Sequence, residues 1–94
     1  MKEFEKIKMF VVDDDPFFSL LMEQSLHNLG VKEITLYDNG TDCLNNLHKS
    51  PELIFLDYNM DNLSGYEVLK KIKRVNPDIY VVLVSAKEEI GAIE

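Results

Sequence analysis

Short apolar runs alternate with amphipathic segments along this chain. Residues 7–12, 53–56 and 79–84 are almost continuously apolar, and residues 31–37 form a weaker run in which apolar and polar positions alternate. Apolar runs of this length are typical of parallel strands that are covered on both faces. In the segments between them, apolar residues recur at steps of three and four, which predicts helices. The order of elements is therefore strand, helix, strand, helix, strand, helix, strand.

Cap and turn residues indicate where the helices begin and end. One aspartate of residues 13–15 is expected to cap a helix that has Pro16 in its first turn, and Gly30 is expected to stop it. A short helix carrying Cys43 follows the turn signal at 38–40. A later helix begins after Ser64 and ends at 76–78. The positions expected to face the sheet are Phe18, Met22, Leu26 and Leu29 in the first helix, and Val68, Ile72 and Val75 in the last.

The length and the order of elements predict one α/β domain. A chain of 94 residues is long enough for a single core and too short for two. Parallel strands need crossover connections, which are right-handed, so the predicted fold is an open parallel sheet with helices on both faces. In such sheets ligands bind at the carboxyl ends of the strands.

Oxygen-bearing side chains follow three of the four predicted strands. Residues 13–15 are three aspartates after the first strand, Asp57 follows the third, and Ser85 follows the fourth. Because these strand ends lie at one edge of the sheet, the side chains are expected to converge. A group of carboxylates is stable when a cation neutralises it, and Mg²⁺ prefers such oxygen ligands. Asp57 is then a candidate nucleophile toward phosphorus, and Ser85 a donor to a phosphoryl oxygen.

Charge and cysteine usage restrict the function further. The chain has 10 Lys and Arg against 17 Asp and Glu, a formal net charge of -7, which argues against direct binding of nucleic acid or an anionic membrane. Its single cysteine excludes an internal disulfide and a zinc site made of several cysteines. No apolar run is long enough for a signal peptide or a membrane span, so a cytoplasmic location is expected. His27 and His48 are interpreted as surface residues.

Four segments of the chain strongly resemble the receiver domain of two-component response regulators. They are residues 10–16, 53–60, Gly65 and 82–86, in this order and at this spacing. The resemblance covers essentially the whole of residues 1–94. It implies a flavodoxin-like fold with strand order 2-1-3-4-5. It also implies a signalling switch and not an enzyme, with a histidine kinase or phosphotransfer protein as partner.

The resemblance also implies a role for each residue of the acidic site. Asp57 corresponds to the phospho-acceptor. Asp13 and Asp14, together with Asp57, correspond to the side chains that bind Mg²⁺, and Asn59 contributes its backbone carbonyl oxygen to the metal. Ser85 corresponds to the switch hydroxyl, which contacts the phosphoryl group. The third aspartate of the 13–15 run takes no part in metal binding.

The chain departs from the family pattern at two places. Asp61 follows Met60 where the family usually has proline. The family also continues with a fourth helix, a fifth strand that ends in a phosphate-contacting lysine, and a fifth helix. Lys87 lies too close to Ser85 to be that lysine, so none is assigned. The expectation is a C-terminally incomplete receiver domain whose uncovered sheet face forms a homo-oligomer.

Two other functions are compatible with parts of the pattern. The first is a degenerate receiver that keeps the fold as a protein-interaction module and is not phosphorylated. The second is a Mg²⁺-dependent phosphohydrolase, which is disfavoured because that class places its nucleophile on the first strand. A calcium-binding loop beginning at Asp57 is rejected, since its sixth position is Asn62 instead of glycine and its twelfth is Val68 instead of glutamate.

Overall fold

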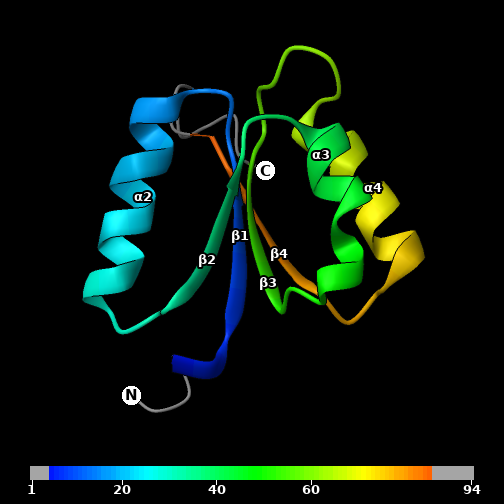
Figure 1. Ribbon diagram of the computed structural model, residues 1–94. Coiled ribbons are helices and arrows are strands. Elements are labelled where there is room, and N and C mark those ends of the chain that lie inside the picture. The colour runs from blue at the N-terminus through cyan, green and yellow to red at the C-terminus, as the bar shows by residue number, and fades with distance from the viewer. Residues whose placement is uncertain (1–4, 86–94) are drawn as a thin grey trace.

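The computed structural model describes residues 5–85, which form four strands and three helices (Figure 1). Within these residues no helix is long and apolar enough to cross a membrane. The elements, in chain order, are β1 (Lys8–Val12), α2 (Pro16–Asn28), β2 (Glu33–Tyr37), α3 (Gly40–Asn45), the 3₁₀ turn η1 (Leu47–Lys49), β3 (Leu53–Asp57), α4 (Gly65–Val75) and β4 (Tyr80–Val84).

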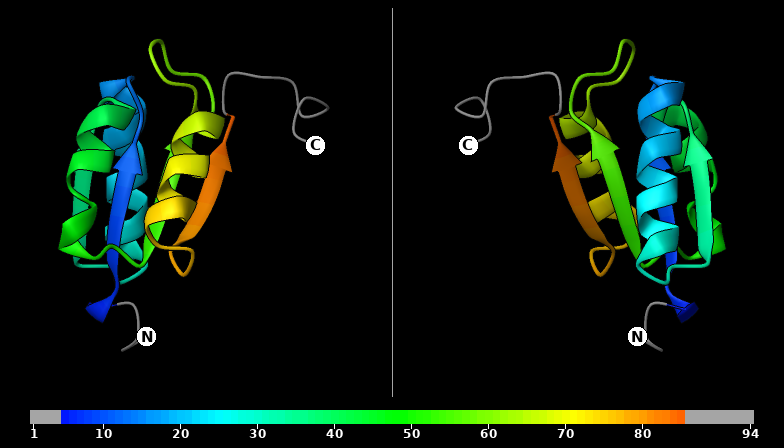
Figure 2. Two further views of the ribbon diagram at one scale, coloured as in Figure 1. Left: turned by 90° about the vertical axis from the view of Figure 1, so that its right-hand side faces the viewer. Right: turned by 90° about the vertical axis from the view of Figure 1, so that its left-hand side faces the viewer.

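The four strands form one parallel sheet in the order β2-β1-β3-β4. Helix α2 covers one face of the sheet, and α3 and α4 cover the other (Figure 1). All four strands point the same way, so their carboxyl ends lie at one edge (Figure 2). The predicted open α/β sheet is thus confirmed, and its order equals the first four strands of the receiver fold. The sequence predicts that no fifth strand follows β4. This prediction concerns residues 86–94, which lie outside the described residues.

Two apolar clusters hold the three layers together. Their members alternate along the strands, because successive side chains of a strand point to opposite faces. On the α2 face the buried residues are Met9, Val11, Leu26 and Val31. On the α3 and α4 face they are Phe10, Val12, Cys43, Leu47, Ile54, Leu56, Val68, Ile72 and Ile79. The larger cluster lies under two helices, whereas a single helix covers the smaller one.

The N-terminus of each of the three helices is capped by a side chain, from Asp15, Asn39 and Ser64 in chain order. The carboxylate of Asp15 accepts hydrogen bonds from the backbone amides of Phe17 and Phe18 at 3.0 and 3.4 Å, so Asp15 is the aspartate that caps α2. Ser64 caps α4 as predicted. Beyond α2, Gly30 has a φ of 106°, a conformation that glycine adopts without a steric penalty.

Two residues expected to face the sheet do not. Leu29 is 61% exposed and Val75 is 67% exposed, whereas the inner positions Leu26, Val68 and Ile72 are buried as predicted. Leu29 is the C-terminal cap of α2, and Val75 is the last residue of α4. Both residues continue the helical period of apolar positions. At these helix ends, however, no part of the described sheet covers the side chains.

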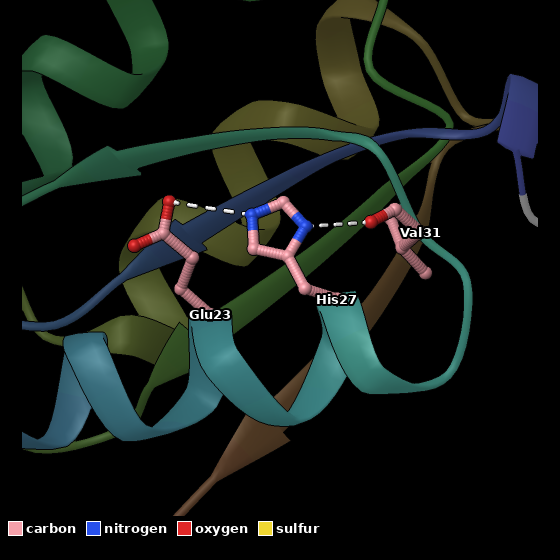
Figure 3. Close-up of polar contacts among 3 residues, drawn as sticks. All are labelled: Glu23, His27 and Val31. Atoms are coloured by element: carbon pink, nitrogen blue, oxygen red, sulfur yellow. Dashed lines mark hydrogen bonds and ion pairs between the residues drawn. The ribbon is translucent and has the colours of Figure 1, made fainter.

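His27 lies in the last turn of α2 (Figure 3). Figure 1 shows this end of α2 at the opposite end of the sheet from the carboxyl ends of the strands. The Nδ1 of His27 is 2.8 Å from the carbonyl oxygen of Val31, so this nitrogen carries the proton and donates. Its Nε2 lies 3.8 Å from a carboxylate oxygen of Glu23, one turn earlier (Figure 3). The exposed imidazole therefore ties the end of α2 to the connection that leads to β2.

Candidate functional site: carboxylates at the strand ends

Three carboxylates meet at the carboxyl edge of the sheet. One oxygen from each of Asp13, Asp14 and Asp57 lies within 4.8 Å of the others. Asp13 directly follows β1 and Asp57 ends β3. The register of these neighbouring strands pairs Val12 with Leu56, which brings the two following aspartates to the same level. Asp13 and Asp57 are each only 5% exposed, so the charges are concentrated in a place with little water.

The backbone around Asp13 is held from three directions. Its amide donates to the carbonyl oxygen of Tyr37 at 3.0 Å, which extends the pairing of β1 with β2 by one residue. Its Oδ1 accepts from the amide of Asp15 at 2.9 Å. Its carbonyl oxygen accepts from the hydroxyl of Ser19 in α2 at 3.4 Å. The turn that presents the two aspartates is therefore fixed by the next strand and by the helix that follows.

Ser19 is not among the site residues that the sequence pattern predicts. This serine is polar, yet it is buried in α2. A signal was present, because a small polar residue one turn after the helix cap can reach the carbonyl groups that precede the helix. Its position next to the first strand could only be found once α2 was placed on the sheet.

The segment after Asp57 is also fixed by backbone contacts. Asp57 Oδ1 accepts from the amide of Asn59 at 3.2 Å. The amide of Tyr58 donates to the carbonyl oxygen of Val84 at 2.8 Å, and the amide of Gly65 donates to the carbonyl oxygen of Tyr58 at 2.9 Å. The start of the loop is thus attached to β4 on one side and to the start of α4 on the other.

Ser85 lies beside this segment. The register of β3 and β4 pairs Asp57 with Val84, the residue before Ser85. The Ser85 hydroxyl is buried and makes no hydrogen bond within the described part of the chain. A buried hydroxyl without a partner is costly, so this side chain suits an acceptor supplied from outside the chain.

A small cleft opens next to the carboxylates. Its volume is about 120 Å³, and it lies between the turn after β1, the start of α3 and the loop that follows β3. Asp61, the residue that replaces the usual proline, is in its wall. The other lining residues are Asp14, Asp38, Asn39, Gly40, Thr41, Met60, Asn62 and Leu63.

The donor set of this edge fits a hard divalent cation. Three carboxylate oxygens, two of them from buried residues, are the kind of ligand that Mg²⁺ takes from proteins, with water or phosphate oxygens completing its shell. Asp15 does not belong to the set, because its carboxylate caps α2. Cys43 is also outside it: the thiol is buried in the larger apolar cluster, and this burial raises its pKa to about 12.

The sequence of the chain matches a known family over nearly its whole length. The family described as the response regulator receiver domain matches residues 9–94. The chain belongs to this family. The resemblance seen in the four motif segments is therefore confirmed, and the observed sheet agrees with the flavodoxin-like fold of receiver domains.

Curated relatives of this receiver domain are much longer proteins. The transcriptional regulator NtrC of Escherichia coli is 31% identical over 85 residues, which are 89% of this chain and 18% of NtrC. A protein-glutamate methylesterase/protein-glutamine glutaminase of Clostridium acetobutylicum is 36% identical over 89 residues, which are 93% of this chain and 26% of the relative. The receiver domain thus spans about a fifth to a quarter of these relatives.

Solved structures show the same fold. The response regulator TrrA of Thermotoga maritima, solved in complex with Mg²⁺ and BeF, superimposes with a TM-score of 0.81 at 30% identity, covering 87% of this chain and 71% of TrrA. The apo receiver domain of NtrC superimposes with a TM-score of 0.79 at 29% identity, covering 94% of this chain and 71% of that one. The TrrA complex shows that a member of the family binds Mg²⁺.

Proposed function

We propose that residues 1–94 act as a phospho-acceptor domain of a two-component system, with Asp57 as the acceptor. The observation that carries this proposal is the meeting of Asp13, Asp14 and Asp57 within 4.8 Å at the carboxyl edge of a receiver sheet. In the proposed reaction, a carboxylate oxygen of Asp57 attacks the phosphorus of the donor. The new P–O bond forms as the bond between phosphorus and the donor's leaving atom breaks, giving an aspartyl phosphate.

Asp13, Asp14 and Asp57 would hold Mg²⁺, and the backbone carbonyl of Asn59 would add a further ligand. When bound, this ion supplies positive charge that offsets the repulsion between the acceptor carboxylate and the phosphoryl oxygens. The chain contributes the position of the ligands. The bonds from Asp13 to Tyr37 and Ser19 support this function, because they hold the ligand-bearing turn in place before any cation arrives.

Ser85 would detect the phosphoryl group. Its buried hydroxyl would donate to an oxygen of the phosphoryl group on Asp57, gaining the partner it does not find among the described residues. Such a bond would draw Ser85, the residue after β4, toward Asp57. Phosphorylation would favour the conformation in which this bond forms. The equilibrium between the two conformations of the domain would then shift toward it.

The proposed partners are a histidine kinase or a phosphotransfer protein in the cytoplasm. The domain would act as a switch and not as an enzyme. Its overall negative charge supports binding to a protein partner in preference to direct binding of nucleic acid or an anionic membrane. The signal would pass on through the protein that binds the phosphorylated domain.

The direct test is an intact-mass spectrum after incubation with acetyl phosphate. The 94-residue chain is expected to gain one phosphoryl group when Mg²⁺ is present and none when it is chelated. Asp57→Asn is the matched control, because the amide keeps the shape of the carboxylate and removes the nucleophile. Ser85→Ala is expected to accept the group but to lose the conformational response.

Each outcome of this test decides between stated functions. No adduct from a folded sample would overturn the proposal in favour of a protein-interaction module. Continuous phosphate release that persists in Asp57→Asn would indicate a phosphohydrolase instead. An adduct that also forms in Asp57→Asn would show that another residue is the acceptor.

We also propose that the chain forms a homo-oligomer through β4, with a second copy of the chain as the partner. Within residues 5–85, β4 is an edge strand. It is built of five uncharged residues, four of which have high strand propensity, and Tyr80 and Val82 are 75% and 40% exposed. Two copies of such an edge fit each other in antiparallel pairing, since no like charges meet.

Light scattering at micromolar concentration tests this oligomer. The expected result is a dimer that Val82→Lys converts to a monomer, because two lysines would then face each other across the pairing. Thr35→Lys on the opposite edge strand β2 is the control. A monomeric wild-type chain would overturn the proposal and leave the phospho-acceptor function untouched.

A further inference from the structure

Asn39 is the N-terminal cap of α3 and Gly40 is its first residue, and the proposed function makes no use of this dipeptide. The Asn39 side chain makes three hydrogen bonds. Its Oδ1 accepts from the backbone amide of Asp42 at 2.7 Å. Its Nδ2 donates to Asp38 Oδ1 at 2.7 Å and to Asp42 Oδ2 at 3.0 Å. The side-chain amide thus caps α3 and also bridges two carboxylates that would otherwise repel each other.

Both residues of this dipeptide are required by their surroundings. A Cβ at residue 40 would lie only 2.4 Å from Val68 Cγ2, in the buried contact between α3 and α4, so only glycine fits. At residue 39, serine or aspartate could cap the helix, but neither could donate to both neighbouring carboxylates. The fold therefore retains the Asn-Gly pair, in which the backbone nitrogen after the asparagine is unhindered by a side chain.

We propose that Asn39 is a site of spontaneous deamidation and that the cap of α3 controls its rate. The backbone nitrogen of Gly40 loses its proton to base and attacks Cγ of Asn39. A C–N bond forms, the bond from Cγ to Nδ2 breaks, and ammonia leaves a succinimide. Water then opens the ring to aspartate or isoaspartate. In the net reaction, the asparagine amide and one water molecule give a carboxylate and an ammonium ion.

The three hydrogen bonds oppose the first step of this reaction. Cγ of Asn39 must rotate toward the nitrogen of Gly40, which requires the bonds to Asp38 and Asp42 to break. Gly40 is itself packed against Val68 and has little freedom to move. The reaction therefore proceeds through molecules in which the start of α3 has opened, and the folded chain reacts more slowly than an unfolded one.

The product cannot restore the original arrangement. A carboxylate at residue 39 has no hydrogens to donate, so it would face Asp38 and Asp42 as a third negative charge. Asn39 and Gly40 also line the small cleft beside Asp14 and Asp61, so the new charge appears next to the acidic site. Isoaspartate additionally lengthens the main chain where Gly40 has no space to shift.

The experiment compares the intact chain with a peptide of residues 37–43 in mildly alkaline buffer. Peptide mapping follows the mass gain at residue 39, and released ammonia is measured separately. The folded chain is expected to deamidate about tenfold more slowly than the peptide. Equal rates in the two samples, or no reaction in the peptide, would overturn the proposal.

Variants separate the local cap from global stability. Asp42→Ala removes the carboxylate that accepts from Asn39 Nδ2 and is expected to accelerate the reaction about fivefold, the effect of losing one side-chain hydrogen bond. Asp42→Asn keeps an acceptor and should react at the wild-type rate. Asp15→Ala weakens the cap of α2 at a distance and should leave the rate at Asn39 unchanged. Asn39→Ser should show no mass gain. An acceleration in Asp15→Ala equal to that in Asp42→Ala would show that global unfolding, not the α3 cap, controls the rate.

Discussion

Gly65 packs directly against the backbone of Asp57. A Cβ at residue 65 would lie 2.3 Å from the carbonyl oxygen of Asp57 and 2.8 Å from the Cα of Tyr58. The amide of Gly65 also donates to the carbonyl oxygen of Tyr58 at 2.9 Å. The first turn of α4 is thus attached to the strand end that carries the proposed phospho-acceptor, with no space for a side chain between them.

Gly65→Ala is expected to push α4 away from Asp57. Both neighbouring atoms belong to backbone, which cannot rotate aside, so the free energy of unfolding should fall by about 1–3 kcal/mol. Urea denaturation measures this loss. The folded fraction should also load less phosphoryl group from acetyl phosphate. Tyr66→Ala, at an exposed neighbouring position, is the control and should change neither quantity by more than the experimental error.

The three consecutive aspartates are expected to respond differently to substitution by alanine. Asp15→Ala removes the cap of α2 and should lower stability by about 1 kcal/mol, while Mg²⁺ binding and the phosphoryl adduct persist. Asp13→Ala and Asp14→Ala should weaken Mg²⁺ binding, measured by titration calorimetry. Loss of Mg²⁺ binding in Asp15→Ala alone would contradict this division of roles.

The buried thiol of Cys43 makes stability fall in alkaline solution. Burial raises its pKa from 9.0 to about 12, so above pH 9.0 the unfolded chain releases a proton that the folded chain keeps. Because the unfolded state then binds fewer protons, the free energy of unfolding decreases as pH rises through this window, by up to about 1.4 kcal/mol per pH unit. Burial also raises the pKa of Tyr37, which acts in the same direction.

Denaturation at several pH values checks this dependence. Cys43→Ala should be less stable than wild type near neutral pH, because it leaves a cavity, but its stability should fall less steeply above pH 9.0. Identical slopes for the two proteins would contradict the prediction. The native thiol should also resist alkylation until the chain unfolds, since it lies within the core.

His27 is expected to be structural and not a phosphoryl carrier. His27→Ala removes the bond to the carbonyl oxygen of Val31 and should lower stability by about 1 kcal/mol, with normal loading of Asp57. His48→Ala, at an exposed position in η1, should leave both stability and loading unchanged. A loss of the phosphoryl adduct in His27→Ala would contradict this assignment.

Much of the fold and the composition of the candidate site could be predicted from local signals. The strand-to-acid transitions at 12–13 and 56–57 indicated which residues converge, because parallel strands end at one edge. The cap residue Ser64 and the stop at Gly30 were also correct, since both act within one turn of the chain. The roles of Asn59 and Ser85 in binding metal and phosphate remain predictions.

The positions of Leu29, Val75 and Ser19 could not be predicted in this way. Helical period indicates which side of a helix faces a partner, but not how far that partner extends, so it does not reveal that Leu29 and Val75 are exposed. Polarity suggests an exposed side chain, yet Ser19 is buried because α2 passes over the carbonyl oxygen of Asp13.

The alternation of elements and the helix caps follow from spacing between residues close in the chain, and the family follows from the order of four motif segments along it. Which glycines have no space for a side chain is visible only once the segments are packed against one another. Gly40 lies against Val68 of α4, and Gly65 lies against Asp57 at the end of β3. Gly40 faces a buried side chain and Gly65 faces backbone, and such close contacts arise from the packing of whole segments, which hydrophobic period does not encode.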